Sequence, residues 1–299
     1  MTVSTVLEPA YRVFDTRVAE VVDLSPAFRR VTVRGDDLDD FADHGDDQRF
    51  KLVLPASRGG YGHFVRSADW YDDWRHLADE HRPPLRTYTV AAVRPAVREV
   101  DFVVARHGAT GPASTWAEST GPGDQVLLVG PNARCEGPTR AAEWAPPAGA
   151  CVLVAGDETA VPAVLGILAG LAPDRRGVAV LEVPSGADVL PVQAPPGVEV
   201  QWLARDGREH GTVLDAAVRS AAARLWGNRP AGAADLDLAD DDADLLWDVA
   251  SAAEGFYAWL AGEAGAIRTL RRHLVREVGV DKRSVTFMGY WKRGAAETN

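Results

Sequence analysis

The hydrophobic pattern of the chain changes character around residues 137–149, and this change constrains the fold more than any other feature. Before this segment, short runs alternate apolar and polar residues. After it, continuous apolar runs alternate with helical patterns. The run Ala145-Pro146-Pro147-Ala148-Gly149 within the segment is typical of a linker. Because 299 residues exceed what one core usually serves, we expect two domains of different architecture, at 10–140 and 150–299, joined by a linker at 141–149.

The first half is predicted to form an antiparallel barrel. Its runs are rich in Val, Phe, Tyr and Thr and are separated by turn-forming residues, as in sheets of many short strands. One helix is expected at Ala113–Ser119, because Gly111-Pro112 precedes this segment and a glycine-rich turn follows it. The predicted strands are Tyr11–Val22, Phe28–Arg34, Phe50–Leu54, Arg86–Val93, Glu99–Val104 and Gln125–Gly130.

The second half is predicted to form a parallel sheet in an α/β domain, because strands and helices alternate along it. The segment Ala231–Asp248 contains seven aspartates and is expected to be a solvated loop or a surface helix. The expected strands are Cys151–Ala155, Gly177–Val183, Glu199–Leu203, Phe256–Ala261 and Ser284–Tyr290, and the expected helices are Ala160–Leu171, Arg208–Ala223 and Gly265–Val278.

The charge balance argues against a nucleic-acid-binding protein. The net charge is −11, whereas a phosphate backbone requires a basic face. The charge is not uniform, because the segment Ile267–Arg293 is rich in Arg and Lys and leaves a basic C-terminal end available to anionic ligands. The two cysteines and seven histidines show no metal-ligand spacing, so no metal site is expected.

The sequence contains no segment that predicts membrane insertion. The N-terminal residues lack the pattern of a signal peptide, and the most apolar window, Cys151–Leu171, is interrupted by Gly156-Asp157-Glu158 and Pro162. We therefore expect a cytoplasmic protein, with reduced cysteines and a monomeric state.

The run Arg86-Thr87-Tyr88-Thr89 places a cation, a phenol and hydroxyls on one predicted strand. The Arg86 guanidinium and the Thr89 hydroxyl suit phosphate or ribityl oxygens, and Tyr88 suits the face of an isoalloxazine ring. A barrel followed by a parallel α/β domain is an arrangement that holds a flavin in one half and a nicotinamide nucleotide in the other. The strand therefore predicts a flavin site.

A second element strengthens this prediction. Gly111, Ala113 and Ser114 open the predicted helix, where free N–H groups and the helix dipole favour phosphate. His107 and the glycine that follows it would lie near the same phosphates. The alternative for Ser114 is that it only caps the helix.

The first strand, turn and helix of the second half form the natural site for a nucleotide, because ligands bind beyond the carboxyl ends of parallel strands. The turn has no G-x-G-x-x-G pattern and contains Asp157, Glu158 and Thr159. Thr159 is expected to reach the ribose or nicotinamide, and Asp157 to line the site or to cap the helix. Arg205 and Arg208 follow the third strand, where a cation would favour NADPH over NADH.

The sequence resembles the siderophore-interacting protein family within the ferredoxin-reductase-like superfamily, and the resemblance covers nearly the whole chain. The matching segments are Arg86-Thr87-Tyr88-Thr89, Val100-Asp101-Phe102-Val103-Val104, His107-Gly108 with Gly111-Pro112-Ala113-Ser114-Thr115-Trp116-Ala117, Gly123-Asp124, Gly130-Pro131, Ala155-Gly156-Asp157-Glu158-Thr159-Ala160-Val161-Pro162-Ala163, Gly262-Glu263, Leu270-Arg271-Arg272-His273-Leu274 and Gly289-Tyr290-Trp291-Lys292-Arg293-Gly294.

The resemblance implies an FAD-dependent ferric-siderophore reductase, with FAD in the barrel and NADH, NADPH or reduced ferredoxin as the electron donor. It implies cofactor-binding roles for Arg86, Tyr88, Thr89, His107, Gly111, Ala113, Ser114, Asp157, Thr159 and Glu263. It also implies that Lys51, Arg134 and Lys292 bind an anionic ferric siderophore, the alternative for each being a solvated surface cation.

The chain departs from the family pattern at two places. Ala91 stands where family members often carry a second arginine, which leaves flavin affinity open, and Asn132-Ala133-Arg134-Cys135 replaces a more glycine-rich loop. Two other functions remain open from the sequence. They are a flavoprotein reductase for another acceptor, such as a ferredoxin-like partner or a quinone, and a siderophore-binding protein without turnover.

Overall fold

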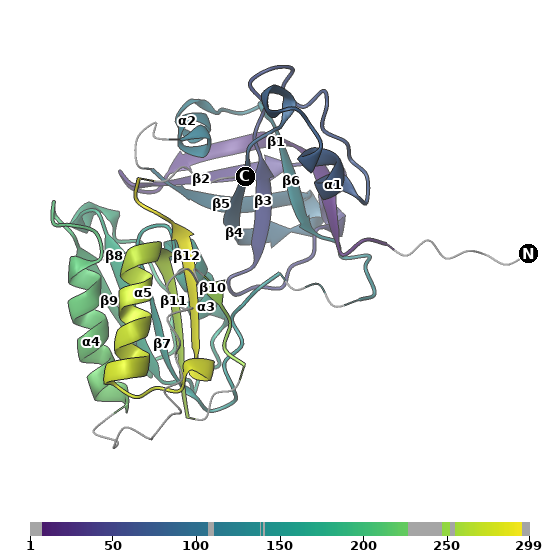
Figure 1. Cartoon of the computed structure of the whole chain (residues 1–299). Coiled ribbons are helices and arrows are strands. Elements are labelled where there is room, and N and C mark those ends of the chain that lie inside the picture. Colours follow the sequence, from purple (N-terminus) through teal and green to yellow (C-terminus); the bar gives the residue numbers. More distant parts are fainter. Residues whose placement is uncertain are drawn as a thin grey trace, which may run out of the picture. The chain divides into compact units, whose positions relative to one another are not determined.

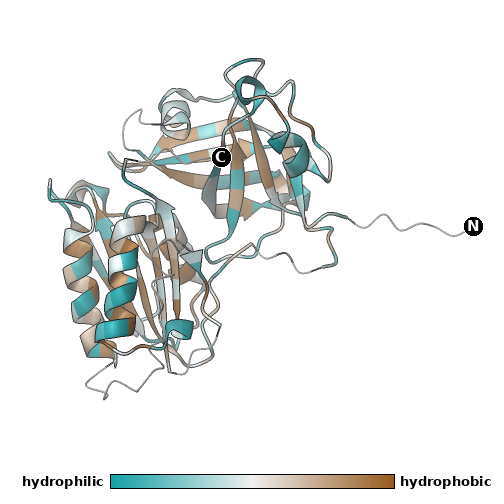
Figure 2. Ribbon diagram, in the orientation of Figure 1, coloured by the Kyte–Doolittle hydropathy of each residue, from teal (hydrophilic) through white to brown (hydrophobic). Residues whose placement is uncertain are grey.

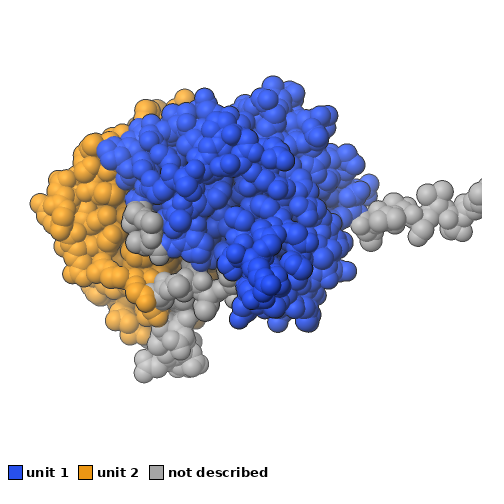
Figure 3. Space-filling model, turned by 90° about the horizontal axis from the view of Figure 1, so that it is seen from above, with its two compact units in different colours: residues 1–142, 299 blue, residues 143–298 orange. Residues whose placement is uncertain are grey.

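The computed structural model describes residues 8–106, 111–137, 139, 141–226, 247–251 and 255–294. These residues divide between Ala142 and Glu143 into two compact units (Figure 3). Figure 2 shows that hydrophobic residues gather on the strands of each unit. Among the helices that are described, none combines the length and apolar character needed to span a membrane.

The first unit is a closed antiparallel barrel with the strand order β1-β2-β5-β4-β3-β6, which confirms the predicted barrel (Figure 1). The first and last residues of each strand lie within one residue of the predicted bounds. The strands are β1 (Tyr11–Asp23), β2 (Phe28–Arg34), β3 (Arg49–Val53), β4 (Leu85–Arg94), β5 (Glu99–Ala105) and β6 (Gln125–Pro131).

The barrel interior is filled by alternate residues of each strand. On β1, Phe14, Thr16 and Val18 are buried at a spacing of two, and the Thr16 hydroxyl donates to the Val126 carbonyl at 2.6 Å. Helix α2 (Pro112–Ser119) packs Ala113 and Ala117 onto the same core, which confirms the predicted helix.

The connection between β3 and β4 contains a short helix, α1 (Trp70–Arg75), which was not predicted. Trp74 is its anchor: the indole is buried beside Val53 and Leu127, and its Nε1 donates to the Pro83 carbonyl at 2.8 Å. One buried aromatic residue therefore fixes a helix too short to show hydrophobic periodicity.

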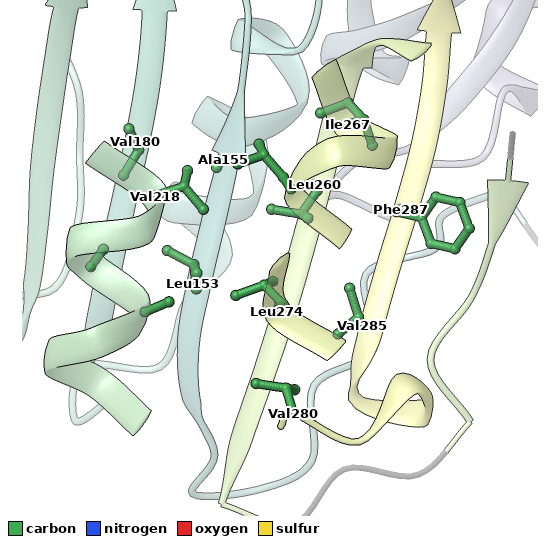
Figure 4. Packing of buried hydrophobic residues seen from close by; sticks show 14 of the residues in the cluster. Leu153, Ala155, Val180, Val218, Leu260, Ile267, Leu274, Val280, Val285 and Phe287 are labelled. Atoms are coloured by element: carbon green, nitrogen blue, oxygen red, sulfur yellow. The ribbon is translucent and has the colours of Figure 1, made fainter. Parts of the chain in front are cut away.

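The second unit has the strand order β10-β12-β11-β7-β8-β9. Its parallel strands are β7 (Cys151–Gly156), β8 (Gly177–Val183), β9 (Val198–Ala204), β11 (Phe256–Glu263) and β12 (Val285–Trp291), as predicted. The helices are α3 (Val161–Gly170), α4 (Thr212–Trp226) and α5 (Ala264–Arg272). Helices α4 and α5 cover one face, where Val218, Ile267 and Leu274 pack against Leu153 and Leu260 (Figure 4).

Three predictions for this unit need correction. Trp247–Asp248, expected in a loop or surface helix, form β10, which pairs antiparallel with β12, so the sheet is mixed at that edge. Residues 231–246 of that segment lie outside the described residues. The last helix is α-helical only to Arg272 and continues as a π-helical turn at His273–Glu277, where His273 Nδ1 lies 2.6 Å from the Arg219 guanidinium. Helix α4 begins at Thr212, later than expected, because Gly211 at φ +82° ends a preceding turn.

Candidate functional site

The predicted flavin-binding strand is β4, and its register fixes which side chains share a side. Tyr88 pairs with Phe50 and Arg86 with Leu52 on β3. Because successive residues of a strand alternate in direction, Arg86 and Tyr88 lie on one side of β4 and Thr89 on the other. Arg86 and Tyr88 are half-buried, and Thr89 is buried. The Arg86 guanidinium donates to the Leu85 carbonyl at 2.7 Å.

A series of aromatic rings connects β4 to helix α2. The Tyr88 ring centroid lies 5.8 Å from that of Phe102 on β5, and Trp116 of α2 stacks on Phe102 at 6.3 Å with an interplanar angle of 18°. Phe102 is buried, whereas Tyr88 and Trp116 are half-buried. The structure therefore brings the two predicted elements of the flavin site, β4 and α2, onto neighbouring positions of the barrel wall.

The N-terminus of α2 has the features of a phosphate site. Its N-cap is Gly111, with no side-chain hydrogen bond to the first turn and no acidic residue in that turn, so the alternative of Ser114 as the cap is wrong. No described atom lies within 4 Å of the position that a Cβ on Gly111 would occupy. The N–H groups at the start of a helix have no intrahelical partner, so Ala113 and Ser114 present donors to a ligand.

The opposite end of α2 is neutralised within the protein. The Arg29 guanidinium donates to the Ala117 carbonyl at 2.6 Å, and Arg106 pairs with Glu118 at 2.6 Å. The negative end of the helix dipole thus has its cation, and the first turn of α2 has no acidic side chain that would compete with an anion. These features fit the diphosphate and ring of FAD. His107 lies outside the described residues.

Two of the three predicted siderophore-binding cations belong to the barrel unit. Lys51 is exposed on β3, and its Nζ donates to the Thr87 hydroxyl at 2.7 Å. Arg134 follows β6 and pairs with Asp40 at 2.6 Å, a contact that raises the pKa of Arg134. Arg134 therefore carries an internal counter-ion that an incoming anion must displace. Ala91 is exposed on β4 at a bulge.

In the second unit, the strand order reverses between β7 and β11, so the carboxyl ends of these strands are where a nucleotide is expected. Asp157 lies there and is buried. Its carboxylate accepts hydrogen bonds from the Glu263 backbone N at 2.7 Å, the Trp291 indole Nε1 at 2.9 Å and the Thr159 backbone N at 2.9 Å, and also from the Thr159 hydroxyl. Asp157 thus ties the ends of β7, β11 and β12 together.

The backbone packs closely against the Asp157 carboxylate at Gly262. Gly262 adopts φ +146°, and a Cβ there would lie 2.6 Å from an Asp157 oxygen. Burial and the neighbouring Glu158 raise the pKa of Asp157 to about 6. Asp157 does not cap α3, whose N-cap is Ala160. The Glu263 side chain is also occupied, because it accepts from the Ala266 backbone N at 2.9 Å as the N-cap of α5.

Sequence reasoning named Arg205 and Glu158 at the same edge of the sheet but missed Glu182 and the pairing of the three residues. Arg205 is buried and paired with Glu158 and Glu182, each at 3.0 Å. Glu182 was detectable as a single acid in the otherwise apolar run of β8, because a buried carboxylate requires a partner. Lys292, the third predicted siderophore-binding residue, follows β12 and is exposed.

Family models match both units. The model described as siderophore-interacting protein matches residues 150–294, and the model described as siderophore-interacting FAD-binding domain matches residues 17–135. The uncharacterized protein Rv2895c of Mycobacterium tuberculosis is 33% identical over 92% of this chain and 88% of its own length. The ferric vibriobactin reductase ViuB of Vibrio cholerae is 27% identical over 90% of this chain and 85% of its own length.

Solved structures agree with these matches. The siderophore-interacting protein SipS from Aeromonas hydrophila has a TM-score of 0.69 and 28% identity, covering 97% of this chain and 95% of its own. The ferredoxin reductase in carbazole 1,9a-dioxygenase shares the fold, with a TM-score of 0.60 and 15% identity over 94% of this chain and 70% of its own. The protein is thus a siderophore-related flavoprotein with an FAD-binding barrel and the fold of a flavin oxidoreductase. The chain belongs to the siderophore-interacting protein family.

Proposed function

We propose that this protein is a ferric-siderophore reductase. It takes electrons from a nicotinamide nucleotide, or from reduced ferredoxin, and delivers them through FAD to the Fe(III) of a siderophore, which then releases Fe(II). The observation that carries the proposal is the aromatic contact series from Tyr88 on β4 through Phe102 to Trp116 of α2, in the barrel of a siderophore-interacting protein. The name of the relative ViuB, a ferric vibriobactin reductase, supports this acceptor class.

The barrel residues bind and orient the cofactor. The Arg86 fork and the N–H groups of Ala113 and Ser114 hold the phosphates, and Tyr88 packs along the ring system. His107 is a further proposed contact, whereas Thr89, which the sequence also suggested, lies on the opposite side of β4 from Arg86 and Tyr88. Bound FAD supplies the redox chemistry, because it exchanges a two-electron hydride with nicotinamide and single electrons with iron.

The proposed siderophore contacts are cationic, because ferric siderophores are often anionic. On the barrel, Lys51 is exposed on β3, and its Nζ donates to the Thr87 hydroxyl at 2.7 Å. Lys292 provides a cation from the second unit. Arg134 is the weakest of the three because Asp40 already neutralises it.

The second unit positions the electron donor. Asp157 holds the ends of three strands in place, so the backbone of Thr159 and Glu263 is fixed at the edge where a nicotinamide nucleotide would bind. We therefore propose that Asp157 and Glu263 act on the donor by positioning backbone. The protein is proposed to act as a monomer in the cytoplasm, where nicotinamide donors are available.

Titration of the purified protein with FAD tests the first step of this proposal. Quenching of FAD fluorescence at stoichiometric ratio and a shifted flavin absorption band are expected. Absence of FAD binding would overturn the proposed reductase function. The remaining function would then be a siderophore-binding protein without turnover, and binding of a ferric siderophore to the flavin-free protein would identify it. Re-oxidation of the reduced protein by a quinone, and not by a ferric siderophore, would instead identify a reductase for another acceptor.

A further inference from the structure

Three charged side chains form a buried cluster in the second unit, which we call the Glu158–Arg205–Glu182 cluster. The Arg205 guanidinium binds both oxygens of the Glu158 carboxylate, each at 3.0 Å, and one of its nitrogens also donates to Glu182 at 3.0 Å. The exposed fractions of the three side chains are 9% for Arg205, 2% for Glu158 and 0% for Glu182. Arg205 is therefore saturated by internal carboxylates.

The cluster spans the carboxyl ends of three neighbouring parallel strands. Glu158 follows β7, Glu182 is the penultimate residue of β8, and Arg205 directly follows β9. In sheets of this kind, the ribose that carries the 2′-OH or 2′-phosphate of a dinucleotide is read by an acid or an arginine near the end of the strand beside the first one. The cluster therefore lies where sheets of this kind distinguish NADH from NADPH.

Glu182 also occupies the other anion-binding group of this region, the N-terminus of α4. One of its carboxylate oxygens accepts from the Gly211 backbone N at 2.9 Å, and the other accepts from the Leu214 backbone N at 3.0 Å. A helix N-terminus ordinarily attracts a phosphate. Here an internal carboxylate has taken those donors, so neither this helix end nor Arg205 is available to a 2′-phosphate.

The other charged side chains described around the cluster do not restore a phosphate site. Two carboxylates and one guanidinium leave the cluster with a net negative charge. His210, whose Nε2 lies 3.7 Å from Glu158, has its pKa lowered mainly by burial and so adds no cation at neutral pH. Arg293 pairs with Glu209 at 2.9 Å, and the exposed Arg208 donates to the backbone carbonyls of Ala204 and Arg205 at 3.5 Å.

We infer that the Glu158–Arg205–Glu182 cluster excludes a 2′-phosphate and thereby selects NADH over NADPH as the reductant. This inference rests on the proposed use of a nicotinamide donor. It assigns Glu158 and Glu182 as specificity-determining residues and removes Arg205 as a phosphate ligand. A free phosphate group at this edge would face net negative charge with its two candidate partners already bound.

Calorimetric titration of the FAD-loaded protein with NAD⁺ and, separately, NADP⁺ tests the inference without using turnover. We expect NAD⁺ to bind at least about tenfold more tightly, a difference of roughly 1.4 kcal/mol. Glu158→Gln and Glu182→Gln each remove one negative charge and release part of Arg205, so each should tighten NADP⁺ binding severalfold and leave NAD⁺ binding nearly unchanged. The matched control is Glu199→Gln, which removes the same charge from an exposed pair with Arg224 elsewhere on β9.

Thermal melting of each variant shows whether it is folded. If Glu182→Gln does not fold, Glu158→Gln still tests the inference. Tighter binding of NADP⁺ than NAD⁺ by the unaltered protein would overturn the inference, and loss of that preference in Arg208→Ala would name the residue responsible. An unchanged NAD⁺ to NADP⁺ ratio in the folded glutamine variants would also overturn it, as would binding of neither nucleotide. Failure of the proposed function is distinguishable, because the same titrations can be made on the flavin-free protein and do not involve a siderophore.

Discussion

The indole Nε1 of Trp291 donates a hydrogen bond to the Asp157 carboxylate at 2.9 Å, although the two residues are 134 positions apart in the chain. This bond joins the end of β12 to the end of β7, and the Glu263 backbone N, at the end of the intervening β11, donates to the same carboxylate at 2.7 Å. One buried carboxylate thus sets the spacing of three strand ends. We expect both the stability of this edge and its pH dependence to depend on Asp157.

Asp157→Asn tests that dependence. Burial and Glu158 raise the pKa of Asp157 from 3.8 to about 6, so the folded protein holds this proton more tightly than the unfolded chain. Its contribution to the free energy of unfolding is therefore fully present below about pH 4 and is lost as the pH rises through about 6. We expect the difference in unfolding free energy between the unaltered protein and Asp157→Asn to fall by on the order of 2–3 kcal/mol across this window.

Urea unfolding at several pH values measures this difference. Taking the difference between the two proteins removes the contributions of the other carboxylates. A difference that stays constant from about pH 4 to about pH 7 would show that Asp157 titrates normally and would contradict the account of this edge.

Ser114→Glu separates the phosphate role of α2 from its helical stability. A negative charge in the first turn stabilises a helix by about 0.3–1 kcal/mol through the dipole, but it repels a phosphate bound at the same place. We expect FAD to bind more weakly while the melting temperature of the flavin-free protein stays equal or rises. Ser119→Glu makes the same substitution at the other end of α2 and should leave FAD binding unchanged. Equal FAD affinity in both variants would rule out the phosphate site.

Arg86→Ala should weaken FAD binding by about 1.5–3 kcal/mol, which corresponds to roughly a tenfold to a hundredfold rise in Kd, as for the loss of a charged hydrogen bond. Arg86→Lys should restore part of the affinity, because lysine keeps the charge but not the two-pronged geometry. Fluorescence titration of FAD measures both. Arg34→Ala, which removes an exposed arginine of β2 paired with Glu99, is the control, and an equal effect there would indicate a general loss of charge.

Lys51→Ala should raise the KM for an anionic ferric siderophore more than it changes FAD binding. The expected loss of siderophore-binding free energy is about 1–3 kcal/mol, as for one charge-assisted contact. Thr87→Val removes the hydroxyl that accepts from Lys51 while keeping the cation, so its KM should change little. Steady-state kinetics with the three proteins test the assignment. An unchanged KM in Lys51→Ala would leave Lys51 as a structural partner of Thr87 only.

Local sequence patterns predicted most of the fold because period-two and buried-strand patterns are properties of short segments. The strands of the barrel and of the parallel sheet were therefore located closely. Helix α1 was not, because its anchor, Trp74, is fixed by Pro83 and by barrel residues that the local pattern does not contain. The two-residue strand β10 exists only through its pairing with β12.

Residue types alone suggest a flavin site at Arg86, Tyr88 and the start of α2, and these roles stay predictions. The site was not predictable where a contact joins distant segments. Asp157 was expected near a ligand, but its partners Glu263 and Trp291 make it a structural carboxylate. The sequence left open whether Arg205 could meet a 2′-phosphate, and in the structure the buried Glu158 and Glu182 hold its guanidinium.

The most direct test of the central claim is a single-turnover measurement under anaerobic conditions. The FAD-loaded protein is reduced with NADH, mixed with a ferric siderophore, and followed at the flavin absorption band with an Fe(II) chelator present. The account predicts that the oxidised flavin spectrum returns together with about two equivalents of trapped Fe(II) per flavin, because a hydride carries two electrons and each Fe(III) accepts one. Flavin that stays reduced in the presence of the ferric siderophore, or is re-oxidised without Fe(II) being trapped, would contradict it.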